Sequence, residues 1–254
     1  MIGSTSFRLH LRSQSLGQDA QGRNQWYVST IDRVVSAAET AILLCDMWDM
    51  HWSRGASERV DAMAPQMNEV VRIARSMGAA IIHAPSDTME CYENAPARRR
   101  MLAVPVVEPP APMEHPDPPL PVDASDQGSD TGETSPYKAW SCEHPALEID
   151  QGSDYISDSG SEVYSLLQQR GIRQLLIMGV HTNMCVLGRS FGIKQMVRWG
   201  VEMALVRDLT DTMYNPARPP YVSHDEGTRL VVAFIEKFWC PTVASSDLMG
   251  LDSG

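Results

Sequence analysis

The stretch "IRQLLIMGVHTNMCV" (172–186) decides how the rest of the chain is interpreted. Its apolar run from Leu175 to Val180 is typical of a central strand in a parallel sheet that is covered on both faces. His181, Thr182, Asn183 and then Cys185 follow at once. Polar groups at the end of a buried strand cost free energy unless something bonds or uses them. The stretch therefore predicts either a tightly bonded turn or a reactive cysteine.

Strand-like and helix-like segments alternate along the chain. Apolar runs of strand length recur at 40–46, 79–85 and 201–208, and helical periodicity is found around 65–77, 163–171, 183–200 and 226–239. Pro65 predicts that the first long helix begins near that residue, because proline fits a first turn. Ser86 is a possible cap of a short helix, and Ser159 with Glu162 and Ser223 with Glu226 have the spacing of capping boxes. The alternation predicts an α/β fold with a mostly parallel sheet.

Two segments stand apart from this pattern. Residues 1–37 are mostly polar, and "FRLHLR" (7–12) alternates like an edge strand, so we predict a short N-terminal β extension. Residues 38–254 then form a single domain. Prolines accumulate from 104 to 121, and an acidic, serine- and glycine-rich stretch follows to 136. This insertion is interpreted either as a disordered linker or as a cover over the active site.

The composition limits the possible partners and surroundings. A net charge of -11 and a pI near 5.0 argue against nucleic acid or an anionic membrane surface as a partner. The sequence has no apolar run of signal-peptide or membrane-spanning length, so we expect a cytoplasmic protein that acts on a small molecule. The cysteines are odd in number and form no CxxC pair, which argues against a disulfide framework and a thiolate zinc site: Cys45, Cys91, Cys142, Cys185 and Cys240.

Three residues are candidates for nucleophilic chemistry at the carboxyl edge of the sheet, where sites lie in open parallel sheets. Cys185 is expected in the first turn of a helix capped by Thr182, where free amides lower thiol pKa values to about 3.5–7.5. Asp46 could accept the thiol proton, and Lys138 could hold the two negative charges together. Each residue also has an ordinary interpretation, respectively as a packed cysteine, a turn cap and a solvated surface lysine.

The motifs around these residues resemble those of the isochorismatase-like cysteine hydrolases, the family that includes nicotinamidase and N-carbamoylsarcosine amidase. The similar stretches are "AILLCDMWDMHW" (41–52), "PYKAW" (136–140) and "IMGVHTNMCVLGRSFG" (177–192). The resemblance implies a three-layer α/β/α sandwich with a six-stranded, mostly parallel sheet. It also implies a catalytic triad of Asp46 as base, Lys138 as charge partner and Cys185 as nucleophile, and a homo-oligomer without a cofactor.

The resemblance further implies a cis peptide bond between Val180 and His181. That bond would turn the N–H groups of His181 and Cys185 into an oxyanion hole for the tetrahedral intermediate.

The sequence departs from the family pattern at two places. Trp48 replaces a usual glutamine, so substrate contacts after the first strand of the domain must differ. "IIHAPSD" (81–87) lacks the Asp-x-His metal motif of nicotinamidases, which disfavours that activity. Asp49, His51 and His83 have metal-compatible residue types, but we expect no metal.

Other polar and aromatic residues near the sheet edge have open roles. The candidates for substrate contact are Trp48, His51, His83, Asn183 and Tyr214, together with His181. For Asp208, Asp211 and His224 we favour structural roles in turns and caps.

The sequence thus predicts a hydrolase that cleaves a C–N bond of a small amide, ureido or carbamoyl compound through a thioester. One alternative is a vinyl-ether hydrolase of the isochorismatase type, which uses no cysteine nucleophile. Another is a catalytically silent binding or redox-responsive protein on the same scaffold.

Overall fold

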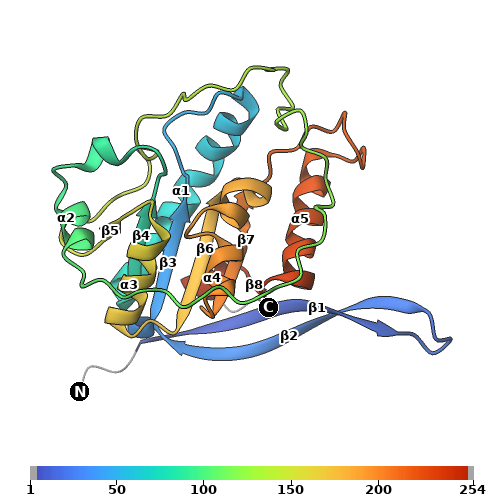
Figure 1. The fold of residues 1–254 in the computed structure, drawn as a ribbon, viewed down its shortest axis with the longest axis horizontal. Helices are drawn as coiled ribbons and strands as arrows, with labels where there is room; N and C mark the ends of the chain where they lie inside the picture. The colour runs from blue at the N-terminus through green and yellow to red at the C-terminus, as the bar shows by residue number, and fades with distance from the viewer. Residues whose placement is uncertain (1–4, 251–254) are drawn as a thin grey trace.

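The computed structural model describes residues 5–250, in which one eight-stranded sheet lies between two layers of helices (Figure 1). The strand order is β2-β1-β8-β7-β6-β3-β4-β5. The strands are β1 (Ser6–Gln18), β2 (Asn24–Ser36), β3 (Thr40–Cys45), β4 (Ala80–Ala84), β5 (Tyr155–Ile156), β6 (Gln174–Val180), β7 (Met203–Asp211) and β8 (Thr242–Val243). The helices are α1 (Arg54–Met77), α2 (Pro96–Leu102), α3 (Gly160–Arg170), α4 (Ile193–Arg198), α5 (His224–Phe238) and α6 (Ser246–Met249). Three short turns complete the elements, η1 (Ala37–Glu39), η2 (Met89–Tyr92) and η3 (Thr182–Val186).

The six strands from β8 to β5 are parallel to one another, which confirms the predicted α/β sandwich. Side chains alternate along β3: Ala41, Leu43 and Cys45 join the core on one face, and Ile42 and Leu44 join the core on the other. The first core packs against α3, α4 and α5, and the second against α1 and α6. Two buried faces explain why the central strands are continuous apolar runs rather than alternating ones.

The N-terminal segment forms a larger element than the predicted edge strand. β1 and β2 pair antiparallel over thirteen residue pairs, and Arg12 of β1 pairs with Thr242 of β8. Leu9 and Leu11 are buried in the core that contains α1. The hairpin therefore extends the sheet by two antiparallel strands, and its far end projects beyond the body of the domain (Figure 1).

The predicted start of the first long helix was wrong. α1 begins at Arg54 and continues through Pro65, which lies inside the helix. Proline removes one helical hydrogen bond, at a cost of about 3 kcal/mol. Val60, Ala64 and Met67 on both sides of it are buried against the sheet, and this continuous apolar stripe outweighs the local cost.

The two predicted capping boxes differ in outcome. The Ser223 hydroxyl accepts the Glu226 N–H at the start of α5, as predicted. Ser159 precedes α3 without such a bond: its hydroxyl pairs with that of Ser161, and the Glu162 carboxylate accepts from Arg98 and from the Ser157 hydroxyl. Ser86 caps no helix either; the nearest helical segments are η2 and α2.

The proline-rich insertion has no helix or strand from 103 to 154, but it is held along its length. Asp117 accepts from Lys194 of α4, the His115 ring stacks on Trp239, and Asp130 pairs with Arg59 of α1. Figure 1 shows the segment passing along α4 and α5 before it crosses toward α1. These contacts argue against the interpretation of the insertion as a disordered linker.

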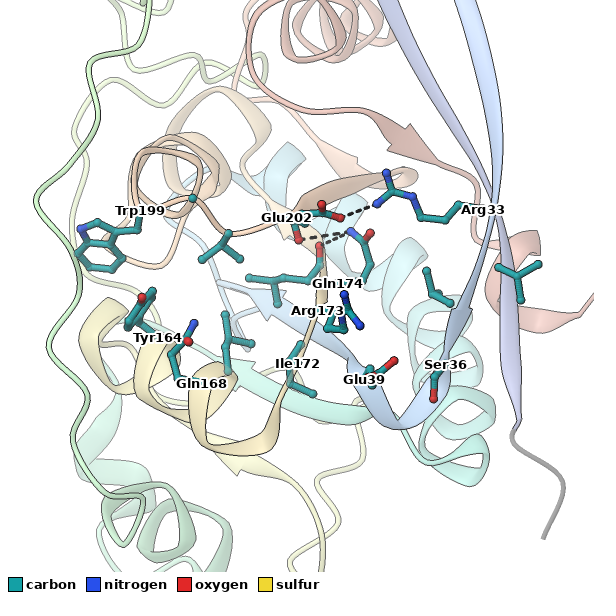
Figure 2. Close-up of a pocket in the computed structure, with 16 residues that line it drawn as sticks. Arg33, Ser36, Glu39, Tyr164, Gln168, Ile172, Arg173, Gln174, Trp199 and Glu202 are labelled. Atoms are coloured by element: carbon teal, nitrogen blue, oxygen red, sulfur yellow. Dashed lines mark hydrogen bonds and ion pairs between the residues drawn. The ribbon is translucent and has the colours of Figure 1, made fainter. Parts of the chain in front are cut away.

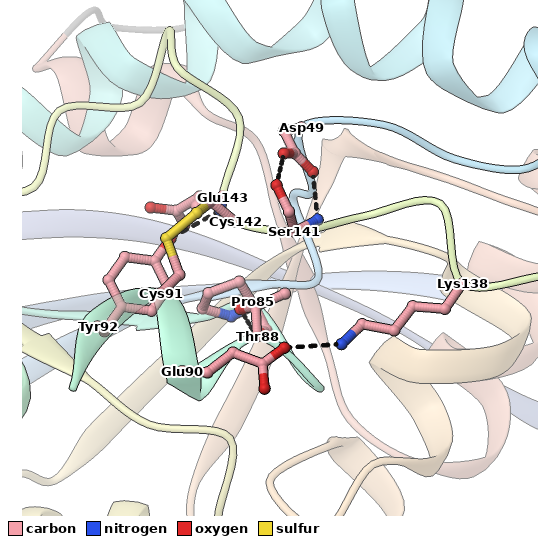
Figure 3. The surroundings of a disulfide bond; sticks show 10 residues. All are labelled: Asp49, Pro85, Thr88, Glu90, Cys91, Tyr92, Lys138, Ser141, Cys142 and Glu143. Atoms are coloured by element: carbon pink, nitrogen blue, oxygen red, sulfur yellow. Dashed lines mark hydrogen bonds and ion pairs between the residues drawn. A yellow bond between two sulfur atoms is a disulfide. The ribbon is translucent and has the colours of Figure 1, made fainter.

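The cysteine pattern argued against a disulfide framework, but the structure contains one disulfide. Cys91 and Cys142 form a disulfide with a Cα–Cα distance of 5.9 Å (Figure 3). Fifty-one positions separate the two residues, so no local spacing pattern signals the bond. Cys45 and Cys240 are buried free thiols, and Cys185 is partly buried.

Candidate active site

Asp46 directly follows β3 and is fully buried at the carboxyl edge of the sheet. Its Oδ1 accepts the Ser86 backbone N–H at 2.8 Å, and its Oδ2 accepts the Arg189 Nε–H at 2.9 Å. Burial raises the pKa of Asp46, and the hydrogen bonds from Arg189, Cys185 and Ser86 oppose that rise. The site thus holds a desolvated carboxylate with a cation and a thiol as neighbours.

Cys185 lies in the π-helical turn η3, which follows β6. Burial, and next the Asp46 carboxylate, raise the pKa of Cys185 to about 12, against the opposing effects of Arg189 and a hydrogen bond from the His181 backbone. We expected a helix N-terminus to lower this pKa. The irregular turn gives way after Leu187 and Gly188 to a bend rather than a long helix, and burial dominates. The resting site therefore holds a protonated thiol beside Asp46.

The predicted helix of 183–200 is divided, because α4 starts only at Ile193. Thr182 is not its cap: the Thr182 hydroxyl bonds that of Thr210 at 2.7 Å, and the residue before η3 is His181. Asn183 exchanges two hydrogen bonds with Met213, which joins η3 to the segment after β7. Asn183 thus bonds the backbone of Met213.

The peptide bond between Val180 and His181 is cis, as the family resemblance implied. Val180 ends β6 and His181 begins the turn, so the bond lies at the junction between strand and turn. The His181 backbone forms a hydrogen bond with Cys185. The main chain next to the cis bond therefore faces the sulfur atom.

Lys138 does not reach Asp46 and Cys185 as we expected. It lies on the surface, and its Nζ is 3.3 Å from Glu90 Oε1 (Figure 3). The cation at Asp46 is Arg189, whose Nη2 also contacts Asp87 at 3.2 Å. Arg189 follows Cys185 by four residues, and its backbone N–H donates to the Cys185 carbonyl oxygen. This helical spacing is the one sequence signal that could have identified it.

Aromatic side chains form a wall beside Asp46. The rings of Trp48 and Trp140 are stacked with centroids 4.1 Å apart, and the His51 ring is parallel to that of Trp140 at 5.9 Å. Trp48, His51 and His181 line a narrow cavity of about 10 Å³ together with Asp46 and Val180, and Cys185 is not among its lining residues. Three of the predicted contact residues, Trp48, His51 and His181, therefore line the cavity, and Trp140 is an addition that the sequence did not indicate.

Both imidazoles of this cavity are neutral. Burial lowers the pKa of His51 to about 4, and its Nδ1 accepts the Ser53 N–H at 3.1 Å, which places the proton on Nε2. Burial, and next the neighbouring His51, lower the pKa of His181 to about 3. The His181 Nε2 is buried without a hydrogen-bond partner. The cavity wall thus offers polar groups that carry no charge near neutral pH.

Two predicted contact residues, His83 and Tyr214, form hydrogen bonds with other parts of the protein. His83 is fully buried, with Nδ1 2.7 Å from Glu143 and Nε2 3.2 Å from Asp154. Burial alone would lower the pKa of His83, but these carboxylates raise it to about 9. Tyr214 is buried against α5, and its hydroxyl donates to the Arg218 carbonyl oxygen. Within residues 5–250, no three His, Cys, Asp or Glu side chains are placed to hold a metal ion.

A second ionic cluster lies behind His181. Asp211 at the end of β7 accepts from Arg59 at 2.8 Å and from His224 at 2.9 Å. Burial would raise the pKa of Asp211, but His224 and Arg59 lower it. Asp208 instead accepts from Ser245. The structural roles favoured for these three acids and bases, Asp208, Asp211 and His224, agree with their contacts.

A wider groove of about 590 Å³ lies at the opposite, amino edge of the sheet (Figure 2). Its walls come from the end of β2, from α3 and from the segment before β7, and Arg33 pairs with Glu202 across it. None of its lining residues is Asp46, Cys185 or Arg189. Cavity size therefore does not mark the candidate active site; the buried polar groups do.

Comparison with known proteins agrees with this architecture. Residues 40–218, more than half of the chain, match the isochorismatase domain. The chain belongs to the isochorismatase family, a family of hydrolases. No curated protein matches the sequence. Among solved structures, the fold is similar to a cysteine hydrolase from Pseudomonas syringae pv. phaseolicola, with 14% identity, 86% of this chain and 95% of that chain covered, and a TM-score of 0.53.

Two further solved structures are similar with lower scores. One is an isochorismatase family protein from Burkholderia thailandensis, with 15% identity, 85% and 97% of the two chains covered, and a TM-score of 0.46. The other is N-carbamoylsarcosine amidase from Thermoplasma acidophilum, with 14% identity, 82% and 96% covered, and a TM-score of 0.42. At 14% identity, the similarity to the Pseudomonas syringae structure establishes the fold alone.

Proposed function

We propose that this protein is a cysteine-dependent hydrolase that cleaves a C–N bond of a small amide, ureido or carbamoyl compound. The observation that carries the proposal is the contact between the Cys185 thiol and the buried Asp46 carboxylate, beside the cis Val180–His181 bond. A nucleophile bonded to a base, with the base oriented by a third group, is the general pattern of covalent catalysis. Here Arg189 is the orienting group.

The first half-reaction forms a thioester. The Cys185 sulfur attacks the substrate carbonyl carbon while its proton moves to Asp46, so that the high pKa of the resting thiol is overcome only as the C–S bond forms. The carbonyl oxygen becomes an oxyanion, which the N–H groups of His181 and Cys185 stabilise. The C–N bond then breaks, and the leaving nitrogen takes the proton from Asp46.

The second half-reaction restores the enzyme. Asp46 accepts a proton from water, and the resulting hydroxide attacks the thioester carbonyl. The C–S bond breaks, the acid product leaves, and the proton returns from Asp46 to Cys185. Arg189 remains charged throughout, because Asp46, Cys185 and Asp87 raise its pKa against the effect of burial.

The cavity lining favours a substrate without a negative charge. Asp46, Asp49 and Asp61 line the cavity, while no lysine or arginine does. The two imidazoles are neutral and act as hydrogen-bonding groups. We therefore expect a neutral amide, urea or carbamate to react faster than the same compound with a carboxylate substituent.

An ammonia-release screen over small amides and ureas tests the proposed activity. The Cys185→Ala and Asp46→Asn variants should release no ammonia from any compound that the wild type hydrolyses. Full activity of Cys185→Ala would refute the nucleophile and favour the vinyl-ether reaction. If the wild type releases no ammonia from any compound, the interpretation as a silent binding protein gains support.

Location and assembly remain proposals. None of the helices described is long and apolar enough to cross a membrane. Disulfides persist mainly in oxidising surroundings, so the Cys91–Cys142 bond stands against the cytoplasmic location that the sequence suggested. Alkylation of free thiols at cell lysis would measure the fraction of oxidised Cys91. Sedimentation would test the expected homo-oligomer.

A further inference from the structure

The cavity wall from Trp48 to His51 is supported from outside by residues 140–143. The Trp140 ring stacks on Trp48 with an interplanar angle of 11° and lies parallel to His51 at the same angle. Trp48 and His51 both line the cavity, whereas Trp140 does not. Trp140 therefore forms a second aromatic layer behind the wall.

Polar contacts continue this support along the segment. The Ser141 N–H and hydroxyl both donate to Asp49, at 2.9 and 2.5 Å, and the Asp49 N–H donates to the Cys142 carbonyl oxygen at 3.0 Å. Glu143 forms an isolated antiparallel bridge with Trp48. Each residue from Trp140 to Glu143 thus contacts the wall.

The disulfide joins this segment to the turn that holds Asp46. Cys91 lies in η2, and the hydroxyl of its neighbour Tyr92 accepts the Glu143 N–H at 2.7 Å (Figure 3). Ser86, a few residues before η2, binds Asp46 through its N–H and the Trp48 indole through its carbonyl oxygen. The loops after β3 and β4 and the 140–143 segment therefore meet around the site, and the disulfide is the covalent link between the last two.

We propose that Trp140 is a positioning residue for the substrate and that the Cys91–Cys142 disulfide holds it against Trp48 and His51. The inference rests on the proposed function of the same site. A dithiol breaks the S–S bond, leaves two cysteine thiols and is itself oxidised to a cyclic disulfide. Cys91 is exposed and so is open to such attack. Once released, the segment supports the wall less firmly.

The expected consequence is a change in KM rather than in kcat. The Asp46, Cys185 and Arg189 contacts come from β3 and from η3 with the residues after it, and they do not involve residues 140–143. One aromatic stacking contact contributes enough to binding to change KM about 3- to 10-fold. We expect Trp140→Ala and reduction of the disulfide each to raise KM by this factor, with kcat changed less than 2-fold.

The test compares the wild type, Trp140→Ala, Trp140→Phe and Cys91→Ser, each with and without a dithiol. Trp140→Phe retains a stacked ring and should restore most of the affinity. Cys91→Ser should have the KM of the reduced wild type and should not respond to the dithiol. Trp26→Ala is the matched control. Trp26 of β2 packs on Phe238 of α5, with ring centroids 5.6 Å apart, and does not line the cavity.

Two measurements do not depend on hydrolysis. Near-ultraviolet circular dichroism reports the stacked Trp48 and Trp140 indoles, and peptide mass spectrometry reports the rate at which iodoacetamide labels Cys185. The dichroism should change on reduction of the wild type. Labelling of Cys185 should be faster after reduction and in Trp140→Ala, but not in Trp26→Ala. These changes without any ammonia release would sink the proposed activity and leave the positioning role standing. Unchanged KM, dichroism and labelling on reduction, or a fall in kcat alone, would overturn the positioning role.

Discussion

Replacing Arg189 with methionine tests whether this cation, and not Lys138, maintains the charge of Asp46. Methionine preserves much of the side-chain length but removes the guanidinium that lies 2.9 Å from Asp46 Oδ2. Asp46 is fully buried, whereas the Arg189 side chain is 30% exposed. Removing one partner of a buried ion pair destabilises a protein by about 3–5 kcal/mol. We take the lower end, about 3 kcal/mol, because Arg189 is partly solvated and Ser86 still donates to Asp46.

The same loss should appear in the pH dependence of the reaction. In the proposed mechanism Asp46 must be ionised to accept the Cys185 proton, so activity should rise with pH as Asp46 loses its proton. Arg189 lowers the pKa of Asp46 against the effect of burial, and its removal moves the acid limb of the kcat/KM profile to higher pH. About 3 kcal/mol corresponds to roughly a 100-fold lower kcat/KM on that limb.

The assay is ammonia release between pH 5 and 9 together with urea unfolding of the same variants. Arg189→Lys retains a charge and should lose less, and Lys138→Met is a matched control that removes a surface cation. In a double-mutant cycle measured by urea unfolding, Arg189→Met should lower the free energy of unfolding much less in an Asp46→Asn background. A neutral amide at position 46 needs no cation beside it. The pairing of Arg189 with Asp46 would be refuted if the acid limb of the kcat/KM profile did not move. It would also be refuted if Arg189→Met lowered the free energy of unfolding equally in both backgrounds.

Three other changes test the remaining geometry. Lys138→Ala should leave kcat/KM within 2-fold and stability within about 1 kcal/mol, because its pair with Glu90 is exposed; a 100-fold loss would return Lys138 to the site. The raised pKa of His83, about 9 against the ordinary 6.5, contributes about 3 kcal/mol to folding that is complete below pH 6.5 and is lost as pH rises through 9. Urea midpoints from pH 6 to 10 should show this loss in the wild type and not in His83→Gln. Gly179→Ala should lower the urea midpoint strongly or prevent folding, because its Cβ would lie 2.1 Å from the Cys45 carbonyl oxygen and φ is +113°; a wild-type midpoint would contradict the close packing of β3 and β6.

The central strands were the most predictable part of the fold. Their apolar runs are long enough to be buried on two faces, and this local property fixes both strand identity and the parallel sheet. The N-terminal hairpin was only partly predicted, because β2 is mostly exposed and lacks an alternating buried face. Pro65 does not mark the start of α1, because burial of the apolar stripe around it outweighs the local preference of proline for a first turn.

The site was predictable to the extent that it depends on strand ends. Parallel strands β3 and β6 are hydrogen-bonded neighbours, so Asp46 and Cys185, which follow them, had to lie near one another. The motif around Cys185 also indicated the cis bond before His181, and the structure confirms it. The sequence by itself thus determined the sheet and the edge at which Asp46 and Cys185 lie.

Only the tertiary structure decided which cation faces Asp46 and how acidic the thiol is. Lys138 follows an insertion without helical or strand periodicity, so its distance from the sheet edge depends on the path of the loop, whereas Arg189 is brought to Asp46 across 143 positions by the turn after β6. The disulfide and the His83 ion pairs likewise join distant segments. The hydrophobic pattern of a segment indicates which of its faces is buried. Charge pairing and desolvation depend on side chains from other segments that lie at the same place in the fold. For this reason only the tertiary structure could show them.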